Sequence, residues 1–191
     1  MAIVGREPMR ARRILLRLRA AGARRVLAEE TALMLVPHAG YPAALEALRA
    51  LHEAWPGHAR TARALTTARV RARGAALCRR VYGAVTPRLL ASLRTLHPDM
   101  AEWVVADGYG RVLSRPGMSA RARELVAVAV LGATGWERQL VSHLRGASRC
   151  GASPRELERA LAAGGARRDR STLAQRAWRT AFGARSDAER G

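Results

Sequence analysis

The chain has 191 residues, of which 49% are hydrophobic, so it can form a compact domain with a substantial core and is not of the disordered class. The formal net charge is +19, the two cysteines are too few for a disulfide framework, and the longest apolar run, residues 125–133, is much shorter than the ~20 residues that cross a bilayer. The N-terminal segment has a short apolar start and then arginines, without a cleavage site of small residues after a hydrophobic stretch. We therefore expect a cytoplasmic protein with no membrane span.

The positive charge raises the question of nucleic-acid binding. All 34 basic residues are arginine, and the chain contains no lysine or asparagine, a composition that a GC-rich genome imposes through its codons. Aromatic side chains for base stacking make up only 4% of the chain, and no RNA-binding motif is present. We predict no specific nucleic-acid binding. A second use of arginine is to hold a small carboxylate with two N–H groups at once.

Helix signals follow one another along the whole chain, and no stretch shows the alternation typical of strands. In chain order, the predicted helices are residues 10–21, 26–36, 42–55, 60–81, 98–112, 120–133, 136–150 and 175–182, and further helices begin at Pro87 and Pro154. The sequence thus predicts an all-α fold of about eight or nine helices.

Several residues mark helix boundaries. Pro37 is expected to end the second helix, and residues 38–42, "HAGYP", form a turn with Pro42 at the start of the next helix. Ser119 is a candidate N-cap, and Gly135 is expected to end the helix that Ser119 begins. Residues 153–156, "SPRE", have the pattern of a capping box with proline at the first helical position.

Glu124 and His143 are the candidate catalytic pair. Glu124 lies in the first two turns after Ser119, His143 lies two turns into the following helix, and Gly135 can form the corner between them. If the two helices run antiparallel, the carboxylate can contact the imidazole and fix its tautomer, as a general acid or base requires. The alternative is a buried hydrogen bond that only stabilises the two helices. The sequence leaves both interpretations open.

The C-terminal half of the chain contains a series of short motifs. Residues 109–157 include "RPGMS", "RELV", a Gln-Leu pair before the histidine, "HLRG" and "SPREL", in this order. This segment resembles the carboxymuconolactone decarboxylase family, whose all-helical fold is shared with the alkylhydroperoxidase AhpD. The resemblance implies an AhpD-like helical bundle.

The AhpD-type members of the family carry a glutamate, a Cys-x-x-Cys pair and a histidine at fixed intervals. Glu124 and His143 stand at the matching interval, but Trp136 and Gln139 occupy the two cysteine positions. The thiol pair that disulfide chemistry needs is therefore absent, which favours the decarboxylase branch over an alkylhydroperoxidase. Cys78 and Cys150 are interpreted as small buried residues.

A second match lies near the N-terminus. Family members follow the glutamate–histidine element with a "YAGFP"-like turn, whereas here "HAGYP" precedes that element, with His38 at the tyrosine position. The chain thus resembles partial internal repeats, and we expect residues 22–55 to pack against the helices of Glu124 and His143, within the chain or across a subunit boundary. The expected parts of what is one compact domain are residues 1–58 with the "HAGYP" closing element, a basic helical connector at 59–100, the decarboxylase-like core at 101–165, and a C-terminal helix and tail at 166–191.

The resemblance implies lyase-type chemistry on a small carboxylated, lactone-like substrate, without a cofactor. We predict no metal site, because His52, His58 and His97 have no acidic or cysteine neighbours at ligand spacing. Glu124 and His143 are the predicted catalytic residues, and the predicted substrate-binding residues are Arg123, Arg145, Gln139, Trp136, His38 and Tyr41. The resemblance also implies a homo-oligomer, a trimer or a hexamer. Two alternatives stay open at this point: a redox protein that uses Cys78 or Cys150, and a helical oligomer of the same fold without catalysis.

Overall fold

The computed structural model describes residues 2–5, 7–57, 65–166 and 171–183. Within these ranges the regular structure is helical and no residue lies in a strand, which confirms the all-α prediction. The elements are α1 (Pro8–Ala20), α2 (Arg25–Leu33), α3 (Leu35–Ala54), α4 (Thr67–Tyr82), a 3-10 turn η1 (Gly83–Val85), α5 (Thr86–Leu96), α6 (Met100–Trp103), a π-helical segment η2 (Val104–Leu113), α7 (Ala120–Thr134), α8 (Glu137–Arg149), α9 (Pro154–Ala163) and α10 (Thr172–Phe182). No helix in the described part of the chain is long and apolar enough to cross a membrane.

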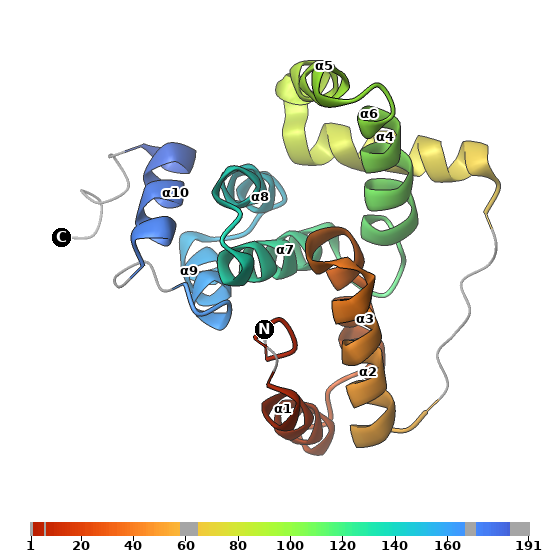
Figure 1. Cartoon of the computed structure of the whole chain (residues 1–191), viewed down its shortest axis with the longest axis vertical. Helices are drawn as coiled ribbons and strands as arrows, with labels where there is room; N and C mark the ends of the chain where they lie inside the picture. The colour runs from red at the N-terminus through yellow and green to blue at the C-terminus, as the bar shows by residue number, and fades with distance from the viewer. Residues whose placement is uncertain (1, 6, 58–64, 167–170, 184–191) are drawn as a thin grey trace.

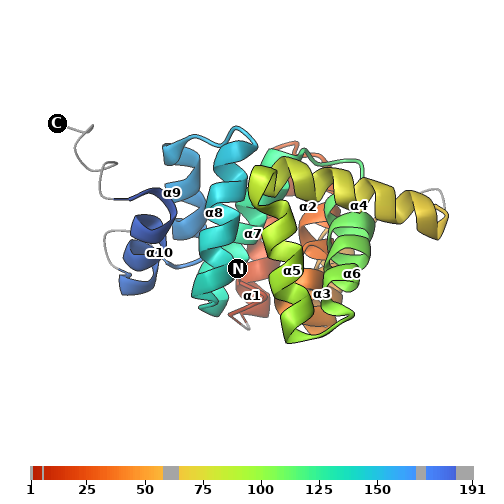
Figure 2. The same cartoon turned by 90° about the horizontal axis from the view of Figure 1, so that it is seen from above.

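Helix α7 lies at the centre of the molecule (Figure 1). It packs against α8 and α9 on one side and against α3 on the other, while α10 and α4 pack against α8. Figure 2 shows α8, α9 and α10 at one end of the molecule and α4, α5 and α6 at the other. The main hydrophobic core follows this arrangement, since Val128 of α7 and Leu140 and Leu144 of α8 are fully buried in it.

The predicted ends of the α7, α8 and α9 helices agree with the structure. The Ser119 hydroxyl accepts a hydrogen bond from the amide of Ala122, and Gly135 ends α7 in the left-handed conformation with φ 80°. Ser153 and Glu156 form the expected capping box at the start of α9. These local signals fix both ends of the helix that carries Glu124 and the start of α9.

One predicted boundary is wrong. Pro37 does not end a helix but lies in the first turn of α3, because α2 already ends at Leu33. Proline is tolerated there, since the first N–H groups of a helix have no partner within it. The expected turn at "HAGYP" is a kink at Gly40, where φ is 85° and helix continues on both sides. The predicted start of the fourth helix at residue 60 lies outside the described residues, and α4 begins at Thr67.

The N-terminal helices pack, within the same chain, on the pair of helices α7 and α8. Helix α3 contacts α7, and Glu30 of α2 forms an ion pair with Arg123 of α7. This answers one question that the sequence left open, because the "HAGYP" segment reaches the Glu124 and His143 helices without a second subunit.

Candidate active site

The central contact of the site joins Glu124 of α7 to His143 of α8. The Oε2 atom of Glu124 lies 2.9 Å from Nδ1 of His143, and the two residues are 1% and 8% exposed. An ionised carboxylate can only accept hydrogen bonds, so the ring donates through Nδ1–H and leaves Nε2 as its second functional nitrogen. When the ring is protonated, the same contact is a buried ion pair.

Gly146 makes room for this contact. It lies almost one turn after His143 in α8, and a Cβ atom there would stand 2.6 Å from Oε2 of Glu124 and 2.6 Å from Cγ1 of Val81. Heavy atoms in contact are normally separated by 3.5–4.0 Å, so any side chain at this position would displace the carboxylate or Val81. The glycine of "HLRG" is therefore a requirement of the Glu124–His143 geometry.

His38 lies directly against His143. The two ring centroids are 5.1 Å apart, with an interplanar angle of 71°, and Nδ1 of His38 lies 2.8 Å from the carbonyl oxygen of Met34. Burial and the neighbouring His143 ring lower the pKa of His38 to about 3, against a smaller opposing effect of the Met34 carbonyl. His38 is thus neutral near pH 7, while its ring stays in contact with the His143 ring.

An open hollow of about 680 Å³ adjoins His38. Thr134 and Trp136, from the α7–α8 corner, line it together with the first half of α3. Of the two histidines in this edge-on contact, His38 is the one on its wall, and Glu46 is the one charged residue among the described residues of the wall. The hollow is large enough for a small organic molecule.

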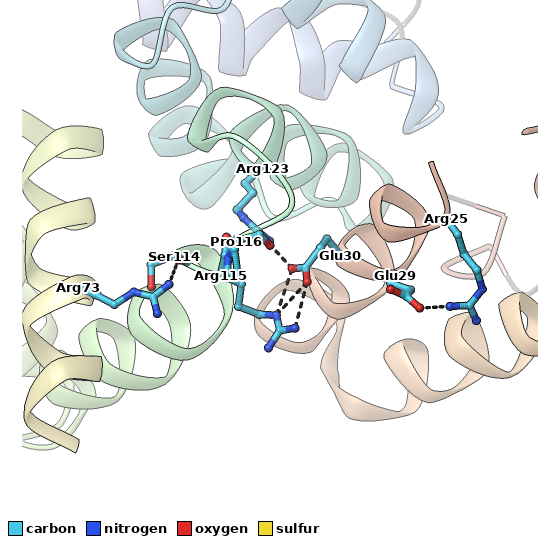
Figure 3. A network of polar contacts seen from close by, with 8 residues as sticks. All are labelled: Arg25, Glu29, Glu30, Arg73, Ser114, Arg115, Pro116 and Arg123. Atoms are coloured by element: carbon cyan, nitrogen blue, oxygen red, sulfur yellow. Dashed lines mark hydrogen bonds and ion pairs between the residues drawn. The ribbon is translucent and has the colours of Figure 1, made fainter. Parts of the chain in front are cut away.

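Arg123, a predicted carboxylate-binding residue, is held by a carboxylate of the protein itself. Its side chain is 1% exposed, and Nη2 donates to Oε2 of Glu30 at 2.8 Å and to the carbonyl oxygen of Arg115 at 2.8 Å (Figure 3). Arg115 contacts the same carboxylate through two nitrogens. Nη2 of Arg123 is thus paired within the protein, and Arg123 is not among the residues that line the hollow, so the structure gives the predicted clamp at Arg123 no support.

Glu30 and Arg115 of this network were not predicted as site residues from the sequence, and the position of Glu30 in the sequence carries a signal. Glu30 follows Val26 by four positions and precedes Leu33 by three, so it interrupts the face of α2 that these apolar residues form. A carboxylate in such a position is buried only when it is paired. With arginine so frequent in the chain, this signal indicates a partner without identifying it.

The remaining predicted substrate-binding residues lie apart from His143. The guanidinium of Arg145 donates to the carbonyl oxygens of Thr180 and Ala181 in α10, so it faces away from Glu124. Gln139 and Tyr41 are exposed, and neither is among the residues that line the hollow. Trp136 is also exposed, but its side chain lines the hollow together with His38.

The two thiols do not have the properties of redox cysteines. Both Cys78 and Cys150 are buried and free, and burial followed by the Glu124 charge raises the pKa of Cys78 to about 12 and raises the pKa of Cys150 as well. A reactive thiol needs the opposite shift. Glu124 also faces a buried pair of phenols, in which Tyr109 donates to Tyr82 at 2.7 Å, and burial raises the pKa of both.

Comparison with known proteins now bears on this site. Residues 98–181, which include Glu124, His143 and Gly146, match the model of the carboxymuconolactone decarboxylase family. This part of the chain is therefore similar to the carboxymuconolactone decarboxylase family. The chain is also similar to a 4-carboxymuconolactone decarboxylase from Acinetobacter baylyi, with 37% identity over 71 residues. That match covers 37% of this chain and 53% of the relative, so the chain spans about half the length of the curated protein that it matches.

No solved structure matches the chain. The segment that matches the carboxymuconolactone decarboxylase family begins at residue 98, so Glu30 and His38 lie outside it. The family segment supplies the Glu124–His143 pair, and the N-terminal helices supply the histidine that faces the hollow.

Proposed function

We propose that the chain is a cofactor-free lyase that removes CO2 from a small carboxylated, lactone-like substrate by general acid–base catalysis. The observation that supports the proposal is the buried 2.9 Å contact between Glu124 and His143, with the His38 ring and an open hollow beside it. The family and the name of the Acinetobacter baylyi relative support the reaction class.

The reaction needs two things from the protein: groups that bind the charged substrate and one proton for the carbon that loses CO2. When the bond between the carboxylate and its carbon breaks, CO2 leaves and the electron pair moves into the system conjugated with the lactone carbonyl. The carbon then takes a proton, which in this proposal comes from His143 while Glu124 stabilises the charged ring. His38, which stays neutral, orients the substrate on the wall of the hollow.

The arginines predicted to bind the substrate carboxylate bear on the same proposal. The described wall of the hollow contains no arginine, and Arg123 and Arg145 are held elsewhere. None of the predicted arginines is therefore assigned to the carboxylate of the substrate.

The test is CO2 release from 4-carboxymuconolactone and related small lactones that bear a carboxylate. Loss of a general acid typically costs about 10²–10⁴-fold in rate, so His143→Gln should lose at least about 100-fold. His97→Gln, at an exposed histidine after α5, should retain wild-type turnover and is the matched control. Equal turnover in His143→Gln and wild type, or no CO2 from any such lactone, would contradict the proposal.

We also propose that the protein is a homo-oligomer. Tyr41 and Leu45 of α3 and Trp136 at the α7–α8 corner are all large and exposed, and Trp136 lines the hollow. A second copy could cover these side chains and make the hollow more apolar. Light scattering coupled to size exclusion should give a mass that is a multiple of the chain mass, and a monomer at micromolar concentration would oppose this proposal.

A further inference from the structure

A second hollow lies among the N-terminal helices. It has a volume of about 280 Å³ and is enclosed by α1, α2 and α3 together with residues 2 and 3. Its wall shares only Ile3 with the wall of the hollow beside His38. A volume close to 300 Å³ is at the lower limit of ligand pockets, so an occupant would be small.

The wall of this hollow is almost wholly apolar and reaches the surface. Leu35 and Leu51 are buried at its base, whereas Ile14, Leu18 and Leu27 on its wall are 43%, 42% and 39% exposed. A hollow with exposed aliphatic side chains around it is typical of a ligand site. The apolar part of a ligand would cover these side chains.

The charge at the hollow is positive. Arg24 is the one charged residue among the described residues of the wall; it is exposed and has no acidic partner in the described part of the chain. By contrast, the next residue, Arg25, is held by Glu29 (Figure 3) and also donates to the carbonyl oxygen of Trp55. Arg24 also stands at the N-terminus of α2, where no side chain caps the first N–H groups, so the helix end adds positive potential.

We propose that this hollow binds a small anionic amphiphile, with an alkyl chain between α1, α2 and α3 and a carboxylate headgroup at Arg24. The apolar wall selects the chain, and the unpaired guanidinium together with the free end of α2 selects the headgroup. This site is independent of the Glu124–His143 chemistry, so it can be tested without any substrate of the lyase reaction.

The test is isothermal titration calorimetry of the full chain with octanoate and with octanol as the neutral analogue. Ala47→Leu places a larger side chain in the hollow and should weaken octanoate binding about tenfold or more, whereas Ala91→Leu, at an exposed position of α5, should not change it. Arg24→Gln should weaken octanoate binding and leave octanol binding unchanged. Arg12→Gln, at an exposed arginine of α1 that does not line the hollow, is the control of equal charge.

Three results would overturn the proposal. These are non-saturable binding of octanoate, wild-type affinity in Ala47→Leu, and equal affinity for octanol and octanoate in the wild type. If Ala47→Leu does not fold, Ala28→Leu fills the same hollow from α2 and replaces it. If the wild type does not bind octanoate and the filled variant loses the oligomeric state of the wild type, the proposal is overturned and a second copy occupies the hollow.

Discussion

Replacement of Gly146 by alanine is predicted to damage both the site and the fold. The added Cβ atom would stand 2.6 Å from Oε2 of Glu124 and 2.6 Å from Cγ1 of Val81. Neither neighbour can move easily, because Val81 is fully buried and Glu124 is held by His143. We therefore expect the carboxylate to be displaced from the imidazole.

Two opposing effects set the change in the free energy of unfolding for Gly146→Ala. Alanine is better than glycine in a helix interior by about 1 kcal/mol. An extra carbon in a packed core typically costs about 1–3 kcal/mol, and here two buried neighbours must move. The matched control is Gly108→Ala in η2, where an added Cβ meets no atom within 4 Å, so only the favourable effect remains. We expect Gly146→Ala to be less stable than Gly108→Ala by about 2 kcal/mol.

Urea unfolding of the two variants measures this difference, and the decarboxylation assay measures the effect on the site. Gly146→Ala should lose turnover even at temperatures where it is folded, because the Glu124–His143 contact is altered, while Gly108→Ala keeps it. A Gly146→Ala variant with the stability and turnover of the control would refute the packing argument for this glycine.

Three further predictions concern ionisable side chains that are buried or half-buried. The pKa of His38 is lowered from 6.5 to about 3 on folding, so the unfolded chain binds more protons below pH 6.5. The free energy of unfolding, measured by urea titration, should therefore fall by about 2 kcal/mol between pH 6.5 and 5, and His38→Gln should remove that loss. The same dependence of stability on pH in His38→Gln and wild type would contradict this prediction. Glu30→Leu leaves the buried Arg123 without its carboxylate and should lower the free energy of unfolding by about 3–5 kcal/mol. The control in urea unfolding is Glu102→Leu, which removes an exposed ion pair. Equal losses of stability in the two variants would contradict the role of Glu30. Because the pKa of Cys78 is about 12, iodoacetamide at pH 8 should alkylate Cys78 no faster than the protein unfolds, and rapid alkylation of the folded protein would restore the redox alternative.

The sequence was sufficient for features that depend on local chemistry. Ser119 and Gly135 mark the two ends of α7, and the Ser153–Glu156 capping box marks the start of α9, because a cap involves residues within one turn. The contact of Glu124 with His143 could be predicted for a similar reason, since one glycine corner joins the two helices.

Long-range partners could not be predicted in the same way. Arg123 pairs with Glu30, which lies 93 residues away, and no local pattern distinguishes Arg123 from the other arginines of the chain. The same limit applies to Arg145, whose partners are carbonyl groups of α10 that become available only when α10 docks on α8. Pro37 was misinterpreted because proline fits both the position after a helix and the first turn of one.

The most direct test of the proposed chemistry is the protonation of Nδ1 in His143. In a ¹H–¹⁵N correlation spectrum of protein labelled at histidine, with the signal assigned by its loss in His143→Gln, Nδ1 should carry a proton whether the ring is neutral or charged, because the Glu124 carboxylate accepts from it. A neutral His143 ring with its proton on Nε2 and a bare Nδ1 would contradict the contact on which that chemistry depends.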